Sequence, residues 1–276
     1  MRSEPPMIEA RGLSKRYRRD RGRIVESMSM HHLLGEIAGM PWRTVRRMLR
    51  PAASARPAED DGVFWALEDA TFDLHAGETL GVIGENGAGK SVLLKLLARI
   101  TPPTRGTAII RGRVGAMLEV SAGFHHELTG RENVFLSGAI LGMSQREIAG
   151  RFDEIVEFAE MRDAIDTPVK RYSSGMTARL AFSVAAHLDA EIMLVDEVLA
   201  VGDTAFRVKC IDVMRSLARS GRSIIFVSHE LDMLERLCDR AILIDHGRII
   251  ADGEPGALVG LHRNDADATE TEELPA

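Results

Sequence analysis

The chain has 276 residues, 45% of which are hydrophobic, and its formal net charge is −6. This length and composition suffice for one large core or two small ones. Two cysteines are too few for a disulfide framework, and the sequence has no run of 18 apolar residues, so we expect neither a disulfide-rich secreted protein nor a membrane-spanning one. The first ten residues lack the apolar stretch of a signal peptide, so we expect the chain to remain in the cytoplasm.

The positive charge of the chain is concentrated near its start. Residues 1–57 hold 13 Lys and Arg against 5 Asp and Glu, so this part carries +8 and the remainder −14. Residues 18–62 are rich in Arg, Met and Pro and predict a basic insert that ends in a linker. Within it, PWRTVRRMLR (41–50) mixes apolar residues with four arginines, which is typical of a basic amphipathic helix on lipid headgroups or on a partner. A helix packed on its own domain, or a solvated insert, explains the same pattern.

The first part of the chain predicts strands and then helices. Residues 7–17 alternate loosely between apolar and polar, which predicts an edge strand leading into a turn. Residues 66–84 predict two strands joined by a turn at Ala76 and Gly77. Residues 107–118 predict further strands, and residues 125–188 predict mainly helices, because their apolar residues fall on one stripe.

Three short apolar runs follow, at residues 191–197, 223–230 and 240–250, and they predict buried strands. Helical patterns separate these runs, as in a parallel α/β sheet. Residues 263–276 hold five acidic residues and one arginine, which predicts a disordered acidic tail.

The segment GVIGENGAGKS (81–91) carries the strongest chemical signal. It fits G-x-x-x-x-G-K-[ST] from Gly84 to Ser91, after an apolar strand and before a helical run, which is the context of a phosphate-binding P-loop. The glycines let the backbone wrap the β-phosphate, Lys90 brings a positive charge to the β and γ oxygens, and Ser91 offers a hydroxyl to Mg²⁺. We therefore predict ATP and Mg²⁺ as cofactors, with the nucleotide held by Gly84, Glu85, Asn86, Gly87, Ala88, Gly89, Lys90, Ser91 and Val92.

Polar residues end two of the later apolar runs. Asp196 would hold Mg²⁺ directly or through water, and Glu197 would orient or deprotonate the attacking water. His229 stands at the end of another predicted strand, where its imidazole could reach the γ-phosphate. Either feature alone is common and usually structural, and the P-loop earlier in the chain is what favours a catalytic interpretation.

A second group of small residues stands before a helical run in RYSSGMTARLAF (171–182). Ser173, Ser174 and Gly175 predict the start of a helix whose free N–H groups could hold an anion. With these pieces in order, the chain resembles the ATPase subunit of an ABC transporter. The motif YSSGM is similar to that superfamily's signature, usually LSGGQ, and AVGD (200–203) is similar to the loop after its catalytic glutamate.

The resemblance covers about residues 7–255 and implies the fold. It implies an α/β P-loop NTPase of the ABC type, with a mostly parallel core sheet, an antiparallel β subdomain, and an inserted α-helical signature subdomain at about residues 121–184. Residues 1–262 would form the ATPase domain. The resemblance also implies a homodimer in which two subunits close head to tail, so that Ser173, Ser174 and Gly175 meet a γ-phosphate bound by the partner chain.

Several positions depart from the superfamily pattern. Val92 stands where a threonine usually contacts the α-phosphate, and the loss of one hydrogen bond, worth roughly 0.5–1.5 kcal/mol net, should leave binding intact. Ser174 replaces the first glycine of the signature. Glu119 is the candidate for the place of a glutamine near Mg²⁺, although its charge would repel the γ-phosphate. Tyr17 matches the aromatic that stacks on adenine, and Trp65 is the alternative after the insert.

A narrower resemblance concerns the transported substrate. The segments ELTGRENVFLSGAILGM, DEVLAVGDTAF and VSHELDMLERLCDRAILIDHGRI are similar to subunits that export O-antigen, capsule or teichoic acid, and the insert after Tyr17 fits that group. This implies an ATP-hydrolysing subunit that powers export of a lipid-linked cell-surface polysaccharide through a separate multi-span permease. It would lie peripherally at the cytoplasmic face of the inner membrane. Some members carry a further carbohydrate-binding domain, which we do not expect here, so glycan choice should lie elsewhere.

The main alternative is a soluble ABC ATPase that acts on nucleic acid or ribosomes. Chromosome-associated types insert a long coiled coil between the P-loop and the signature, whereas Lys90 and Ser173 are only 83 residues apart here. Ribosome-associated types usually hold two cassettes, and this chain has one. A protein that binds ATP without hydrolysing it is disfavoured, because Lys90, Asp196, Glu197 and His229 are all present. We therefore expect no nucleic-acid partner.

Overall fold

A six-stranded sheet forms the centre of the computed structural model, which describes residues 5–20, 23–25, 62–118, 123–196, 204–228 and 230–272. Its strand order is β10-β9-β4-β8-β7-β6, and every neighbouring pair is parallel except the β9–β10 hairpin. The predicted turn at Ala76 and Gly77 is confirmed, and so are the buried strands predicted at 191–197 and 223–230. The single buried strand predicted at 240–250 is wrong, because a turn at residues 246–247 divides this run into the buried β9 and the partly exposed β10. The strands are β4 (Thr79–Ile83), β6 (Val114–Met117), β7 (Ile192–Asp196), β8 (Ser223–Val227), β9 (Arg240–Asp245) and β10 (Arg248–Gly253).

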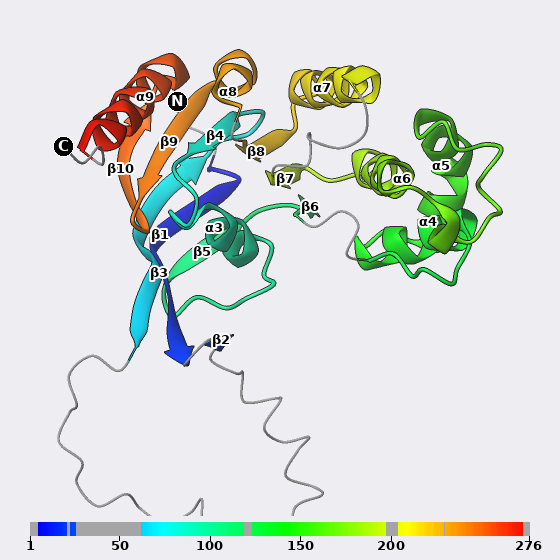
Figure 1. Ribbon diagram of the computed structural model, residues 1–276, viewed down its shortest axis with the longest axis horizontal. Helices are drawn as coiled ribbons and strands as arrows, with labels where there is room; N and C mark the ends of the chain where they lie inside the picture. Colours follow the sequence, from blue (N-terminus) through cyan, green and yellow to red (C-terminus); the bar gives the residue numbers. More distant parts are fainter. Residues whose placement is uncertain are drawn as a thin grey trace, which may run out of the picture.

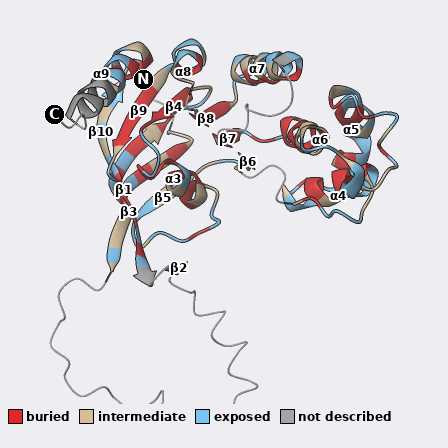
Figure 2. Ribbon diagram, viewed as in Figure 1, coloured by how far each residue is buried: buried red, intermediate tan, exposed pale blue. Residues whose placement is uncertain are grey.

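The central strands are buried on both faces (Figure 2). On one face, Val82, Leu194 and Ile225 belong to a core that is shared with α3 (Lys90–Leu97) and the antiparallel sheet. On the other face, Val195 and Phe226 belong to a second core, which is shared with the later helices. This two-sided burial explains why these strands are continuous apolar runs in the sequence.

A four-stranded antiparallel sheet lies beside the central one (Figure 1). It consists of β1 (Ile8–Asp20), β2 (Arg23–Val25), β3 (Val63–Leu74) and β5 (Arg105–Ile110). The predicted edge position of the first strand is wrong, because β1 pairs with β3 along one side and with β5 and β2 along the other. The alternation of apolar and polar residues indicates which face of the sheet each side chain occupies. It does not indicate how many neighbouring strands the backbone pairs with. Residues 26–61, which include most of the predicted basic insert, lie outside the described residues.

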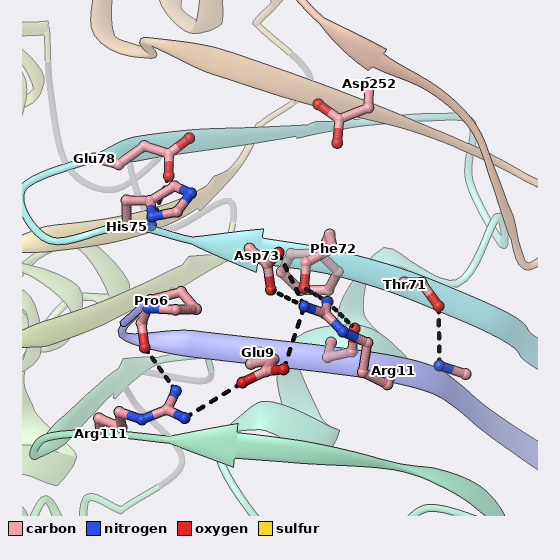
Figure 3. Close-up of polar contacts among 12 residues, drawn as sticks. Pro6, Glu9, Arg11, Thr71, Phe72, Asp73, His75, Glu78, Arg111 and Asp252 are labelled. Atoms are coloured by element: carbon pink, nitrogen blue, oxygen red, sulfur yellow. Dashed lines mark hydrogen bonds and ion pairs between the residues drawn. The ribbon is translucent and has the colours of Figure 1, made fainter. Parts of the chain in front are cut away.

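Ion pairs cross the antiparallel sheet near the start of β1 (Figure 3). The Arg111 guanidinium contacts Glu9 at 3.3 Å, and the Arg11 guanidinium contacts both Glu9 at 3.3 Å and Asp73 at 2.8 Å. Arg11 also donates to the carbonyl oxygen of Phe72 at 3.3 Å. These contacts join β5, β1 and β3 and hold the first half of β1 in place.

Helices flank the central sheet and form a separate group at one end (Figure 1). Helix α3 follows β4 on the side of the antiparallel sheet, and α7, α8 and α9 lie along the opposite face. Helices α4, α5 and α6 contact one another, and α6 also contacts β6. The bounds are α3 (Lys90–Leu97), α4 (Gly130–Ile140), α5 (Gln145–Phe158), a 3₁₀ turn η1 (Val169–Arg171), α6 (Ser174–Ala186), α7 (Thr204–Arg219), α8 (Leu231–Leu237) and α9 (Pro255–Glu272). The mainly helical character predicted for residues 125–188 is confirmed.

Two of the helices in the separate group begin with complete capping boxes. Thr129 caps α4 together with Glu132, and Ser144 caps α5 together with Glu147, with side chain and backbone bonded reciprocally in each pair. Such boxes satisfy N–H groups that a helix start otherwise leaves open. Each box therefore stabilises the first turn of its helix.

The end of the chain differs from the disordered acidic tail that its composition predicts. Helix α9 continues to Glu272, and Leu258 and Val259 in its first half are buried. Packing at the start of the helix supplies the nucleus from which the helical backbone continues into the acidic part. Residues 273–276 lie outside the described residues. Within the part of the chain that the structure describes, none of the helices has the length and apolar character of a membrane span.

Candidate nucleotide-binding site

The loop between β4 and α3 approaches neighbouring backbone so closely that only glycine fits at two positions. Gly84 has φ 153°, and a Cβ there would lie 2.3 Å from the carbonyl oxygen of Ile244. Gly89 has φ 111°, and a Cβ there would lie 2.4 Å from the carbonyl oxygen of Ala66. Both conformations strain residues with a side chain. Gly84 and Gly89 are thus required by the backbone conformation of the loop itself.

Lys90 is the first residue of α3 and is 6% exposed. Its Nζ donates to the carbonyl oxygens of Gly84 at 2.7 Å and Glu85 at 2.9 Å, so the ammonium lies inside the curl of the loop. Gly89 stands at the N-cap of α3 and has no side chain to cap it. The first N–H groups of α3 and the Lys90 ammonium therefore offer positive charge to an anion at this point.

A cavity of about 400 Å³ opens in front of the loop. All but three of its lining residues are among the nucleotide-binding residues that the sequence predicts; Phe64, Ala66 and Lys95 are the additional ones. Two predicted residues lie behind the cavity wall: Gly84 accepts from Lys90, and Ala88 donates to Glu85 and accepts from Gly247. The cavity is lined by Tyr17, Phe64, Ala66, Glu85, Asn86, Gly87, Gly89, Lys90, Ser91, Val92 and Lys95.

The aromatic end of the cavity consists of Tyr17 and Phe64. Their ring centroids are 6.1 Å apart with an interplanar angle of 34°, and they stand opposite each other on β1 and β3. Trp65 does not line this cavity, and the Arg105 guanidinium lies over its ring at 5.1 Å. Successive side chains of a strand point to opposite faces, so Phe64 and Ala66 lie on one face of β3 and Trp65 lies on the other. Of the two aromatic candidates for stacking on a base, the geometry favours Tyr17.

The carboxyl edge of the central sheet holds the predicted Asp196. It is the last residue of β7 and pairs with Val227 of β8, which is a direct neighbour of β4. Because these strands are parallel, their carboxyl ends share the edge at which the P-loop leaves β4. The three other predicted residues at this edge, Glu197, His229 and Glu119, lie outside the described residues.

The second small-residue loop has a different position and geometry. Ser173 is the N-cap of α6, and its Oγ accepts from the backbone N–H of Met176 at 3.1 Å. Ser173 and Ser174 are exposed, and the nearest atom to a Cβ added at Gly175 would be 3.8 Å away. None of Ser173, Ser174 and Gly175 lines the cavity in front of the P-loop. Figure 1 shows α6 in the helical group, away from α3.

The residue before this loop holds it in place. The Tyr172 hydroxyl donates to the carbonyl oxygen of Ala164 at 2.7 Å, and its burial raises the pKa of Tyr172 above the usual value for a tyrosine. A Cβ at Gly130 would lie 2.2 Å from the same hydroxyl oxygen, so the start of α4 must be glycine for Tyr172 to fit. The loop is therefore anchored from behind while its small residues face outward.

Helix α6 is also joined to α7, the helix that follows residues 197–203. Glu160, directly after α5, forms ion pairs with Arg179 of α6 and with Lys209 of α7. The Arg179 guanidinium lies over the Phe206 ring of α7 at 5.8 Å, and Phe206 packs against Phe182 of α6 with ring centroids 6.0 Å apart. These contacts fix α6 relative to α7.

Known proteins resemble this chain in sequence. A family model described as "ABC transporter" matches residues 67–200. The chain is 47% identical to the ABC transporter protein AbcA of Aeromonas salmonicida, over 79% of this chain and 69% of that protein. It is 44% identical to the O-antigen export system ATP-binding protein RfbB of Klebsiella pneumoniae, over 72% of this chain and 81% of that protein. It is 42% identical to the teichoic acids export ATP-binding protein TagH of Listeria monocytogenes, over 67% of this chain and 55% of that protein.

Solved structures share the fold at low sequence identity. The ATP-binding cassette MJ0796, in a dimeric post-hydrolysis state bound to ADP and Pi, matches with a TM-score of 0.65 and 18% identity, over 90% of this chain and 99% of that chain. A structure titled as the ATP binding subunit of an ABC transporter matches with a TM-score of 0.65 and 21% identity, over 94% of this chain and 93% of that chain. The predicted fold class is confirmed.

Proposed function

The chain belongs to the ABC transporter family, and from this premise we propose that it powers export of a lipid-linked cell-surface polysaccharide through a separate multi-span membrane subunit. As a member of that family it is an ATP-binding ATPase subunit. The export role rests on its 41–47% identity to relatives that include O-antigen and teichoic acid export ATP-binding proteins. We further propose that it lies peripherally at the cytoplasmic face of the membrane.

One observation supports a shared active site in a homodimer. Among the described residues, α3 and α6 both begin after loops of small residues, and of these two loops the P-loop lines the nucleotide cavity while the loop at Ser173 does not. In the dimer that we propose, Ser173, Ser174 and Gly175 of one subunit complete the site of the other. The anchoring of their loop by Tyr172 gives these residues a fixed outward geometry, which suits contact with a partner.

The donor set suits Mg²⁺ beside the phosphates. Ser91 lines the cavity, and Asp196 ends β7 at the same edge of the sheet; their hydroxyl and carboxylate are the hard oxygen donors that Mg²⁺ prefers. When bound, Mg²⁺ would neutralise charge on the phosphate oxygens during transfer. Glu119 remains a proposed third contact.

The chain's own groups then divide the work of hydrolysis. Tyr17 stacks on the base, while Lys90 and the first N–H groups of α3 hold the phosphates. Glu197 accepts a proton from the attacking water, and His229 contacts the γ-phosphate. The partner's signature loop completes the anion site, so that hydrolysis and the closed dimer depend on each other.

Co-purification from detergent-solubilised membranes of the native host tests the export role. We expect a multi-span membrane subunit to accompany the chain, and we expect a strain with Lys90→Ala to lose surface polysaccharide and accumulate it inside the cell. A chain that brings RNA, DNA or ribosomes instead of a membrane subunit would contradict export and support the nucleic-acid alternative.

A mixing experiment tests the shared site. Lys90→Ala removes the P-loop charge, and Ser173→Arg blocks the exposed signature loop, so each homodimer should be inactive. A heterodimer of the two variants would keep one site with both halves intact, and we expect partial recovery of ATPase activity. If mixing restores nothing, and crosslinking fails to join Ser173→Cys of one subunit to Gly87→Cys of another, the shared site is wrong.

The basic insert adds a proposal about the membrane surface. Arg43, Arg46, Arg47 and Arg50 lie outside the described residues, and their spacing predicts one basic helix face. Each arginine near an anionic leaflet is worth about 1 kcal/mol. Changing all four to glutamine should leave ATP binding intact and reduce export or stimulation of ATPase activity by the membrane subunit. Unchanged export and stimulation would show that the insert is only solvated.

A further inference from the structure

A buried lysine that the proposed hydrolysis does not use lies directly behind the aromatic end of the cavity. Lys15 is 2% exposed and is among the largest fully buried side chains of the described residues. Burying an ammonium is costly unless other groups replace its water. A buried lysine next to a binding site therefore calls for a physical account.

The Lys15 ammonium contacts both a backbone carbonyl and an aromatic ring. Its Nζ donates to the carbonyl oxygen of Pro102 at 3.0 Å and lies over the Tyr17 ring, 5.2 Å from the ring centroid. Tyr17 lines the nucleotide cavity and Lys15 does not. The ring therefore contacts both the buried cation and the cavity, and a base would meet the ring from the cavity.

The backbone around Lys15 is bonded to the same segment as its side chain. The carbonyl oxygen of Ser14 accepts from the N–H of Thr104 at 2.8 Å, and the N–H of Arg16 donates to Thr104 Oγ1 at 3.2 Å. Pro102 and Thr104 follow α3 closely in the chain. Lys15 and its neighbours thus connect the Tyr17 end of β1 to the segment that leaves the P-loop helix.

The strand is irregular at this point. The pairing of β1 with β3 shifts register on both sides of Lys15, between Leu13 and Lys15 and again between Lys15 and Arg16. Irregular pairing leaves a strand with fewer regular ladder bonds to fix its orientation. The contacts of Lys15 therefore act where the ladder alone holds β1 least firmly.

We propose that Lys15 is a positioning residue that fixes the Tyr17 ring for stacking on the nucleotide base and keeps this platform in register with the P-loop helix. The inference rests on the proposed ATP site and adds a residue that never touches the nucleotide. A desolvated cation over an aromatic ring is strongly attracted to it, which restricts the ring to one orientation. The bond to Pro102 ties that orientation to the chain that follows α3.

The test separates the base from the phosphates. Calorimetric titration of the full chain with MgATP and with magnesium tripolyphosphate, which lacks base and ribose, measures a Kd for each ligand. Lys15→Met should weaken MgATP binding about tenfold, which corresponds to losing one desolvated cation–ring contact, and should leave tripolyphosphate within about twofold. In a Tyr17→Ala background, Lys15→Met should have no further effect on MgATP, because Lys15 acts through that ring.

Arg11→Met is the matched control on the same strand. Arg11 holds β1 to β3 through Asp73 (Figure 3), lies in the first half of the strand and does not line the cavity. It should lower the melting temperature and leave the ratio of the two Kd values unchanged. If Lys15→Met does not fold, Lys15→Gln replaces it, because glutamine keeps a donor for Pro102. We expect it too to weaken MgATP binding more than tripolyphosphate binding, and to have no further effect in the Tyr17→Ala background.

Three results would overturn the inference: MgATP binding unchanged by the Lys15 substitution, equal weakening of both ligands, or the same loss of MgATP affinity with Tyr17 already removed. The first shows that the residue is dispensable, and the others show a general effect on folding. Failure of the wild-type chain to bind either ligand would instead overturn the proposed nucleotide site, and this inference with it.

Discussion

The loop before α3 and the loop before α6 both place small residues at a helix start, but they satisfy that start differently. Helix α3 begins after Gly89, which offers no side-chain cap, and its first turn carries the buried Lys90. Helix α6 begins after Ser173, whose Oγ already accepts from the N–H of Met176. The first helix leaves its open N–H groups to a ligand, whereas the second satisfies part of its own start and keeps small residues on the surface.

The two loops also differ in how closely other atoms surround their glycines, and the P-loop is the more crowded one. A Cβ at Gly89 would collide with backbone at 2.4 Å, whereas a Cβ at Gly175 would meet nothing closer than 3.8 Å. The P-loop is thus shaped by its own chain, and the signature loop has room for a surface that arrives from elsewhere. This difference explains why, of these two loops, the P-loop lines the nucleotide cavity and the signature loop does not.

The largest expected effect comes from removing the proposed base that both loops depend on. Glu197→Gln should preserve ATP affinity and lower turnover on the order of 10²–10⁴-fold, because proton abstraction from water is lost. With ATP uncleaved, the partner's signature loop stays closed on it. Size-exclusion chromatography with light scattering should therefore find a dimer with ATP and a smaller species with ADP. Near-normal turnover in the purified complex would refute the role of Glu197.

The same substitution placed in each loop sharpens the comparison. Gly89→Ala should weaken ATP binding to the isolated subunit about 10- to 100-fold, because the added Cβ strains a backbone at φ 111° and displaces Ala66. Gly175→Ala should change that affinity less than about twofold, because its surroundings are open. ATPase activity of the dimer should fall for both variants. Equal loss of affinity in the isolated subunit would mean that both loops bind one subunit's own nucleotide.

The sequence predicts the P-loop side of the site better than the rest. The motif from Gly84 to Ser91 is local, and its spacing specifies the turn, the lysine and the helix start together. Phe64 and Lys95 escape such reasoning, because their place at the cavity depends on how β3 and α3 pack against β1 and the loop. The alternation of β3 could have found Phe64, since it shares a face with Ala66 and not with Trp65.

Long-range pairing explains the other differences. The position of β1 between two neighbours follows from β5, whose partner residues lie about a hundred places later in the chain, as in the pairing of Ile8 with Ile110. Composition predicts disorder for the acidic end, whereas burial of Leu258 and Val259 starts a helix that continues into it. Tertiary contacts of this kind override local propensity.

A smaller change tests whether the P-loop helix can take one more ligand contact. Val92 lines the cavity in the first turn of α3. Val92→Thr adds a hydroxyl of similar volume and should tighten ATP binding about 2- to 10-fold, the value of one net hydrogen bond. Val92→Ala is the matched control, because it removes volume and adds no donor, and it should not tighten binding. Equal Kd values for Val92→Thr and wild type would mean that this position faces no phosphate oxygen.

The smallest effect concerns the acid sensitivity of the helical group that carries the signature loop. Bonds from the Ser144 backbone N–H and side chain, and then from Arg113, lower the pKa of Glu147 from 4.5 to about 2. A lowered pKa stabilises the fold when the pH is above the pKa that Glu147 has in the unfolded chain. This contribution disappears as the pH falls from about 4.5 towards 2. Glu147→Gln keeps the capping geometry without the charge, so its urea midpoint should depend less on pH across this range.

Two further measurements relate this effect to the contrast between the loops. Ser144→Ala, which removes the N-cap of α5 and costs about 1 kcal/mol at neutral pH, should reduce the effect of Glu147→Gln, because the two side chains act as one box. ATP should raise the urea midpoint of the wild-type chain without changing its acid dependence, because the nucleotide caps α3 and leaves α5 untouched. If ATP abolished that dependence, the start of α3 and the start of α5 would be coupled. The helical group would then not be stabilised independently of the nucleotide site.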